Sequence, residues 1–149
     1  MIRLEALKTD YVDLWQIHSL GDPGDVDNRL DSGVLDVVMK AKEEGKARFL
    51  GVSTHTPRLQ IVADRAIDSG RFDVIMLAYH HGIWPRLGEI VDRAHDEQDM
   101  GVVAMKTLKG ARHRNLADFH EANTYAQAAL KWVHANPKVS CAVISFFEM

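Results

Sequence analysis

Short runs of apolar residues alternate along this chain with longer stretches in which apolar residues recur every three or four positions. The short runs contain β-branched and aromatic residues and are bounded by turn formers, which predicts β-strands. We expect five strands, over residues 11–18, 48–53, 72–79, 101–105 and 139–145.

The stretches between these runs predict helices. Residues 1–9 resemble the last turns of a helix, and Asp31 or Ser32 is a candidate cap for a helix ending near Glu44. Thr56 and Pro57 suit the cap and first position of the next helix, which ends at Gly70. Two further helices are expected around residues 87–94 and 125–133, and residues 106–121 are expected to form a loop.

Strands and helices therefore alternate four times before a final strand. The strands are apolar throughout, which is typical of a parallel sheet with both faces covered by helices. Two α/β architectures fit: a doubly wound open sheet and a (β/α) barrel. A Gly-x-Gly-x-x-Gly motif does not follow any predicted strand, so the dinucleotide-binding open sheet has less support. A length of 149 residues predicts a single domain, residues 1–149.

The composition and net charge limit the classes of binding partner that can be expected. With 46% hydrophobic and 26% charged residues the chain has the composition of a globular protein, and a formal charge of −3 gives no reason to expect nucleic acid or an anionic membrane. Apolar runs stay shorter than the ~20 residues of a membrane span. Cys141 is the single cysteine, so an internal disulfide cannot form. We expect a soluble cytoplasmic protein.

Candidate chemistry begins at His18, which ends the first predicted strand and precedes the turn formers of residues 19–24. Active sites of parallel α/β proteins form at the carboxyl ends of strands. The alternative is a strand-end histidine whose ring is satisfied by backbone groups. His55 and His80 also follow predicted strands. Three imidazoles at one barrel mouth could hold Zn²⁺, although carboxylates are absent beside them.

Four stretches, in this order, resemble motifs of the aldo-keto reductases. They are Asp10-Tyr11-Val12-Asp13-Leu14-Trp15-Gln16-Ile17-His18, Gly45-Lys46-Ala47-Arg48-Phe49-Leu50-Gly51-Val52-Ser53, Gly101-Val102-Val103-Ala104-Met105-Lys106-Thr107-Leu108, and Ala129-Leu130-Lys131-Trp132-Val133 before Asn136-Pro137. The resemblance implies an oxidoreductase that reduces small aldehydes and ketones with NADPH or NADH. It also implies a TIM-type (β/α)₈ barrel, of which this chain would be the part holding strands four to eight.

The resemblance implies a role for several residues. His18 would orient the substrate and polarise its carbonyl group. Ser53 and Thr54 would hold the nicotinamide carboxamide, although the family has Asn where this chain has Thr54, and one hydroxyl cannot replace both hydrogen bonds of an amide. Met76 stands where the family often has a Gln, and Met105 where many members have an aromatic ring under the nicotinamide. The pyrophosphate would be bordered by Lys106, Thr107 and Leu108.

The resemblance places the family's catalytic Asp, Tyr and Lys on strands that have no counterpart in this chain. In the family the Tyr hydroxyl gives a proton to the carbonyl oxygen, and the Lys makes it a better acid. With five strands of eight, the first and last would have unpaired edges. We therefore expect a fragment of a longer reductase, a piece that complements another chain, or self-association. A non-catalytic fragment with a structural or interaction role is the alternative function.

Overall fold

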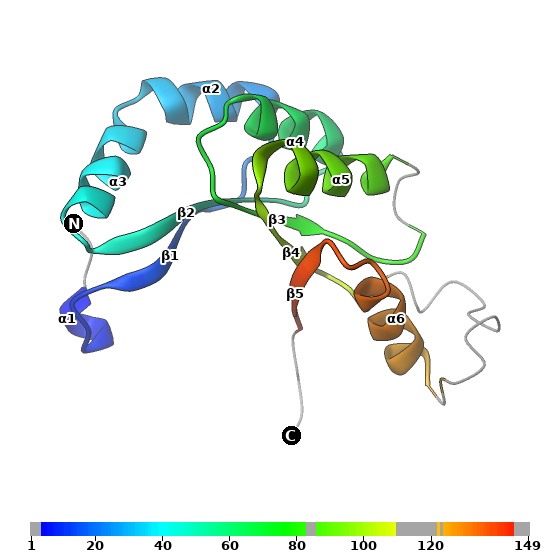
Figure 1. Ribbon diagram of the computed structural model, residues 1–149. Helices are drawn as coiled ribbons and strands as arrows, with labels where there is room; N and C mark the ends of the chain where they lie inside the picture. The colour runs from blue at the N-terminus through cyan, green and yellow to red at the C-terminus, as the bar shows by residue number, and fades with distance from the viewer. Residues whose placement is uncertain (1–3, 83–85, 110–121, 123, 145–149) are drawn as a thin grey trace. The chain divides into compact units, whose positions relative to one another are not determined.

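The computed structural model describes residues 4–82, 86–109, 122 and 124–144, and over these it contains five strands that alternate with helices (Figure 1). The strands are β1 (Val12–Ile17), β2 (Ala47–Thr54), β3 (Val74–Ala78), β4 (Gly101–Met105) and β5 (Val139–Val143). The helices are α1 (Leu4–Leu7), α2 (Pro23–Asp31), α3 (Val34–Glu43), α4 (Leu59–Asp68), α5 (Leu87–Gln98) and α6 (Tyr125–His134). The parallel strands are ordered β1-β2-β3-β4-β5, as in the sequence. The chain divides into two compact units, residues 1–74 and 75–149.

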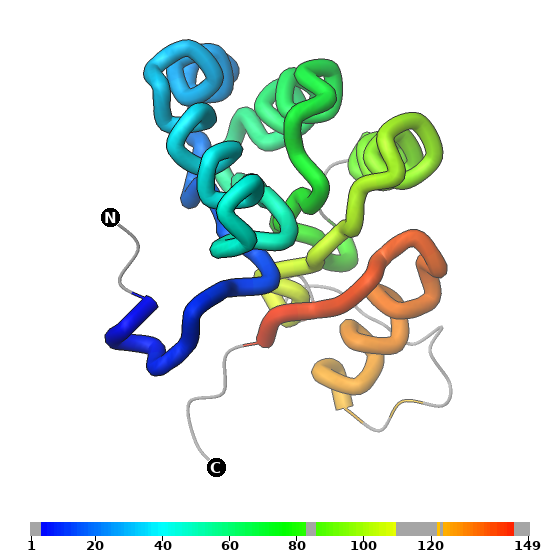
Figure 2. The backbone as a smooth tube through the Cα atoms, turned by 60° about the vertical axis from the view of Figure 1, so that its left-hand side comes forward, coloured from blue at the N-terminus to red at the C-terminus, as the bar shows by residue number. Residues whose placement is uncertain are grey.

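The first unit contains the parallel pair of β1 and β2, in which Leu14 is opposite Phe49 and Gln16 is opposite Gly51. Helices α3 and α4 contact β2, and α2 contacts both of these helices. In Figure 2 the chain can be followed from β1 (blue) through α2 and α3 into β2. The core of the unit is aliphatic, with fully buried Leu20, Val26, Val38, Leu50, Val52, Leu59 and Val62.

Helix α2 was not predicted, because its first residues were interpreted as a turn. Asp22 is its N-cap and accepts a hydrogen bond from the backbone of Gly24, while Asp25 accepts one from the backbone of Asp22. This reciprocal capping, with Pro23 in the first turn, starts a helix from residue types that also form turns. The expected caps at Asp31 and Ser32 are wrong, since those residues end α2 and the next helix is preceded by Gly33.

The predicted start of α4 is also displaced. This helix begins at Leu59, and Arg58 occupies its cap position without a side-chain capping bond. The hydroxyl of Thr56 still accepts a hydrogen bond from the backbone N–H of Arg58 at 3.2 Å, and the Leu59 N–H donates to the Thr56 carbonyl. A turn at Thr56–Arg58 therefore precedes the helix.

The second unit contains the parallel pair of β4 and β5, with a register irregularity between Val102 and Val103. Helix α5 contacts β4, and α6 contacts β5. Helix α5 is joined to the start of β5 by Lys138, whose ammonium donates to the carboxylates of Asp92 and Asp96, each at 2.6 Å. The predicted strand over 101–105 is confirmed, whereas residues 110–121 of the predicted loop lie outside the described residues.

Strands β1 and β5 are less buried than is expected for strands with both faces covered by helices. In β1 one residue, Ile17, is buried, and in β5 only Val139 is. The side chain of Phe49 in β2 is 44% exposed, and that of Val143 in β5 is 48% exposed. One face of each strand pair is thus covered by helices, while apolar side chains on the described strands remain in contact with solvent.

Candidate functional site

His18 follows the last residue of β1, and its side chain is exposed. The next residue, Ser19, has a φ of 54°, in the left-handed region that non-glycine residues rarely adopt. This conformation turns the chain away from the strand direction directly after the histidine.

The end of β2 lies against this turn through Ser53, which is 1% exposed. The backbone N–H of Ser19 donates to the Ser53 hydroxyl oxygen at 2.8 Å, and the Leu20 N–H donates to the Ser53 carbonyl at 2.9 Å. Nδ1 of His18 lies 3.4 Å from the same hydroxyl oxygen. Two residues that are 35 positions apart in the sequence, both predicted site residues, are therefore brought together in the first unit.

Thr54 strengthens the same junction. Its hydroxyl donates to the carbonyl of Leu20 at 2.9 Å, and its side chain is 1% exposed. Two residues later, the Thr56 hydroxyl donates to the carbonyl of Gly21 at 3.2 Å. Since a hydroxyl has one proton, Thr54 retains only acceptor capacity for a ligand.

Beneath His18, on the same side of β1, Gln16 lies over Gly51. A Cβ at residue 51 would come within 3.0 Å of Gln16 Cγ and of Leu14 Cδ1, and within 3.3 Å of the Val74 carbonyl oxygen. The absence of a side chain at Gly51 is therefore what leaves room for Gln16. Its amide nitrogen is buried without a hydrogen-bond partner in the part of the chain that the structure describes.

Of the predicted cofactor residues of the second unit, Met76 lies within β3, and residues 105–108 lie at and directly after the end of β4. Met105 ends β4 and its carbonyl accepts a hydrogen bond from the N–H of Tyr79 at 3.0 Å. Lys106 is exposed, has a φ of 56°, and its carbonyl accepts from the N–H of Lys109. The turn after β4 thus starts with a left-handed residue, as does the turn after β1.

Thr107 is 2% exposed, and its hydroxyl has no hydrogen-bond partner among the described residues. A buried hydroxyl without a hydrogen-bond partner is energetically unfavourable, and a bound ligand or an ordered water would supply the missing partner. Leu108 and Met76 are half-buried, the latter within β3.

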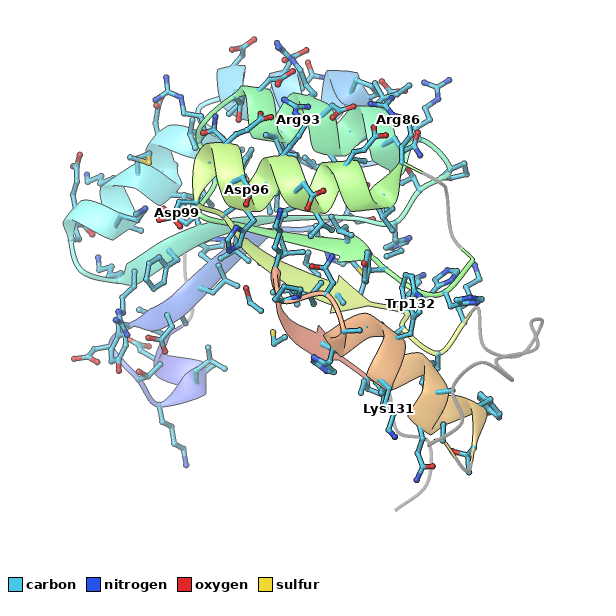
Figure 3. The ribbon with its side chains drawn as sticks, turned by 45° about the vertical axis from the view of Figure 1, so that its right-hand side comes forward. Arg86, Arg93, Asp96, Asp99, Lys131 and Trp132 are labelled. Carbon is cyan, nitrogen blue, oxygen red and sulfur yellow. The ribbon has the colours of Figure 1, made fainter. Side chains whose placement is uncertain are left out.

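An aromatic cluster that the sequence did not predict follows β3. The ring of Tyr79 stacks on Trp132 of α6 with centroids 5.0 Å apart, and the His81 ring meets Trp132 edge-on at 5.6 Å. The Tyr79 hydroxyl accepts a hydrogen bond from the Asn136 side chain at 3.2 Å, so Tyr79, which directly follows β3, is held on both its ring and its hydroxyl. In Figure 3 Trp132 is turned toward the strands of its unit, and Lys131 points away.

His80 lies beside this cluster, and its Nδ1 is 3.2 Å from the His81 carbonyl oxygen. Burial lowers the pKa of His80 and outweighs the backbone contact with His81, which raises it; the charges of Lys109 and His81 lower the pKa by smaller amounts. Across the described ranges, His, Cys, Asp and Glu side chains do not form a group of three that could hold a metal ion.

His18, Ser53 and Thr54 belong to the first unit, and the remaining predicted site residues belong to the second. Apart from Met76, which lies in the middle of β3, these residues lie at the carboxyl ends of the strands of their own unit. The resemblance to the aldo-keto reductases predicts that His18, Ser53 and Lys106 converge on one rim of a barrel.

Comparisons with known proteins agree with the motifs. The sequence model described as "Aldo/keto reductase family" matches residues 3–123. An L-galactose dehydrogenase of Arabidopsis thaliana is 37% identical over 82 residues, which are 54% of this chain and 24% of that protein.

Solved structures of aldo-keto reductases are similar in fold. An enzyme from Klebsiella pneumoniae in complex with NADPH matches with a TM-score of 0.68 and 24% identity over 95% of this chain. A structure from the same organism with NADP and acetate gives 0.64 and 25% identity over 95%, and a thermostable enzyme with the inhibitor epalrestat gives 0.64 and 23% over 93%. The predicted partial barrel of alternating strands and helices is thereby confirmed.

This chain spans 51% of the length of each of these solved relatives. Among the described helices, none is both long and apolar enough to cross a membrane. The family match extends over most of the sequence, and the motifs, the alternation of strands and helices and the solved relatives agree with it. The chain therefore belongs to the aldo/keto reductase family.

Proposed function

We propose that this chain supplies carbonyl-orienting and cofactor-binding residues to a reductase of aldehydes and ketones that uses NADPH or NADH. The observation that carries the proposal is the contact of His18 with Ser53 at the carboxyl ends of two paired parallel strands. An exposed imidazole held at such an edge is suited to donating a hydrogen bond to a substrate carbonyl oxygen.

The nicotinamide would lie beside these residues and supplies the hydride when bound. Ser53 already accepts from the Ser19 N–H, and its second lone pair can accept from the carboxamide N–H. The Thr54 hydroxyl can also accept a hydrogen bond from the carboxamide, but it cannot donate one, because its proton is donated to the Leu20 carbonyl. Met76 and Met105, both half-buried, would add weak acceptor capacity and polarisable surface.

The dinucleotide's pyrophosphate would lie against the turn after β4. Lys106 presents an exposed cation there, and the buried Thr107 hydroxyl has no partner among the described residues, so both fit a phosphate group. Leu108 would cover the apolar side of the same turn.

The proton for the substrate oxygen would come from outside residues 1–149, since the family's Asp, Tyr and Lys have no counterpart among the motifs of this chain. We propose that the isolated chain binds the dinucleotide and turns over slowly. General acid catalysis contributes about 10²–10⁴ in rate, and that factor would be missing. Full activity would need a complementing polypeptide. Cys141 is free and exposed, which suits a reducing cytoplasm.

A second candidate function is a non-catalytic interaction fragment. The observation that favours it is the exposure of Phe49 and Val143 on strands of the two units. Apolar side chains on a sheet without a cover favour association with another chain or a second copy. Under this alternative the chain would associate without binding a nicotinamide dinucleotide.

The test is a fluorescence titration of the purified chain with NADPH, followed by measurement of carbonyl-dependent NADPH oxidation. We expect saturable binding, weakened about 10-fold or more by Lys106→Met, as for loss of a charge-assisted hydrogen bond. Lys40→Met is the matched control, because Lys40 is an exposed cation paired only loosely with Glu44 at 4.0 Å. Absence of binding would favour the interaction fragment. Rapid turnover by the isolated chain would show that the proton donor lies within it.

A further inference from the structure

The hydroxyl of Ser53 has two neighbours and a single proton. The backbone nitrogen of Ser19, 2.8 Å from Oγ, can only donate, so it occupies one of the two lone pairs of the oxygen. The other neighbour is Nδ1 of His18, at 3.4 Å. An imidazole nitrogen can either donate or accept, so the distance alone does not fix the direction of this contact.

The burial of Ser53 determines the direction of the hydrogen bond between Ser53 and His18. The residue is 1% exposed, so solvent does not offer its proton an acceptor. Within the described residues, Nδ1 of His18 is the acceptor in reach of that proton. A buried hydroxyl proton without an acceptor is unfavourable, and donation from Ser53 to Nδ1 satisfies both groups at once.

We propose that Ser53 is a positioning residue that donates its proton to Nδ1 of His18 and thereby holds the proton of the neutral ring on Nε2. Nε2 is the ring nitrogen farther from Ser53, on an exposed side chain. The functional meaning rests on the proposed reductase activity, since Nε2–H is then the donor that faces a substrate carbonyl. A ring with its proton on Nδ1 would present only a lone pair to that oxygen, which repels it.

The surrounding backbone keeps this arrangement in place. Ser19 has a left-handed backbone conformation, and its N–H donates a hydrogen bond to Ser53 Oγ. The N–H of Leu20 donates a hydrogen bond to the Ser53 carbonyl. Ser53 therefore contacts the His18 turn through both its side chain and its backbone. Thr54 stabilises the same turn through its hydrogen bond to the Leu20 carbonyl, but this bond does not involve His18. A variant of Thr54 therefore tests whether the stability of the turn alone affects the position of the His18 ring proton.

The test is long-range ¹H–¹⁵N NMR of the full chain labelled at histidine nitrogens, without any ligand, at a pH where the His18 ring is neutral. His18→Asn assigns the ring signals. In the wild type we expect Nδ1 to give the signal of an unprotonated nitrogen and Nε2 that of a protonated one. In Ser53→Ala the ratio of Nε2–H to Nδ1–H forms should fall about 2- to 10-fold, the range of one neutral hydrogen bond.

Ser53→Thr, which keeps the hydroxyl, should restore the ratio, and Thr54→Val should leave it unchanged although it removes a brace of the same turn. The proposal is overturned if wild-type Nδ1 is protonated, if Ser53→Ala leaves the ratio unchanged, if Ser53→Thr folds but does not restore it, or if Thr54→Val shifts it equally. Because the measurement contains no dinucleotide, its result is independent of NADPH binding. Failure of the proposed function and failure of this inference are therefore distinguishable.

Discussion

Replacing Gly51 with alanine should destabilise the chain, although glycine-to-alanine changes in regular structure usually stabilise. The backbone at Gly51 is not in the left-handed region, so alanine is conformationally allowed there. Its Cβ would nevertheless approach Gln16 Cγ and Leu14 Cδ1 to 3.0 Å each. Those side chains can rotate, but the Val74 carbonyl oxygen at 3.3 Å is backbone and cannot move freely.

The expected magnitude follows from two opposing effects. Overpacking of this kind costs about 1–3 kcal/mol, while the smaller conformational freedom of unfolded alanine returns about 0.4–1 kcal/mol. The free energy of unfolding should therefore fall by about 1–2 kcal/mol for Gly51→Ala. For a chain of this size that corresponds to a decrease in Tm of about 2–8 °C.

The assay is urea unfolding followed by circular dichroism, which should show a lower midpoint with an unchanged slope. Gly88→Ala is the matched control, because Gly88 lies in α5 and an added Cβ would meet nothing within 4 Å. That variant should be more stable by about 0.5–1 kcal/mol. An unfolding midpoint for Gly51→Ala at or above that of the wild type would refute the steric reasoning.

Three further changes probe other contacts. Asp73→Ala removes the carboxylate that accepts a hydrogen bond from the backbone N–H of Leu50 at 2.7 Å. The free energy of unfolding, measured by urea titration, should therefore fall by about 1–3 kcal/mol. An unchanged midpoint would mean that water replaces the carboxylate. Asp22→Ala removes the cap of α2 and should lower stability by about 0.5–2 kcal/mol, with faster amide exchange in the first turn of α2; uniform exchange rates would contradict this. Because burial lowers the pKa of His80 in the folded chain, its contribution is fully present above its ordinary value of 6.5 and is lost as the pH falls from there through the folded value. His80→Asn should therefore reduce the difference between urea midpoints measured at about pH 8 and about pH 5.5, and an identical difference would exclude His80 as its source.

The order of strands and helices could be predicted because apolar spacing is a local property of the sequence. Helices α5 and α6 and strand β4 were expected at or close to their observed positions for that reason. Helix α2 was missed because Asp22 and Pro23 are typical both of turns and of helix starts, and the choice depends on the hydrogen bonds that Asp25 makes.

The candidate site divides in the same way. His18 could be singled out because it ends an apolar run, and the motifs pointed to Ser53. That their side chains are in contact, and that Ser19 donates to the same oxygen, are tertiary facts without a signal in the local sequence. Thr54 was expected to hold the nicotinamide carboxamide, and the structure adds that its proton is donated to the Leu20 carbonyl, which leaves it acceptor capacity alone. The spacing of apolar and polar residues in the sequence identifies which residue stands at the end of a strand. It does not identify the group to which that residue's side chain donates a hydrogen bond.

The left-handed residues after β1 and β4 have an evolutionary consequence. Ser19 and Lys106 both occupy a backbone region that costs a non-glycine residue about 1–2 kcal/mol, and glycine would remove that cost. A search for stabilising substitutions would therefore select Ser19→Gly and Lys106→Gly early. At Ser19 such a change would loosen the amide that donates to Ser53, and at Lys106 it would remove the cation that we propose for the pyrophosphate. Both substitutions should therefore raise thermal stability and weaken the proposed reductase function.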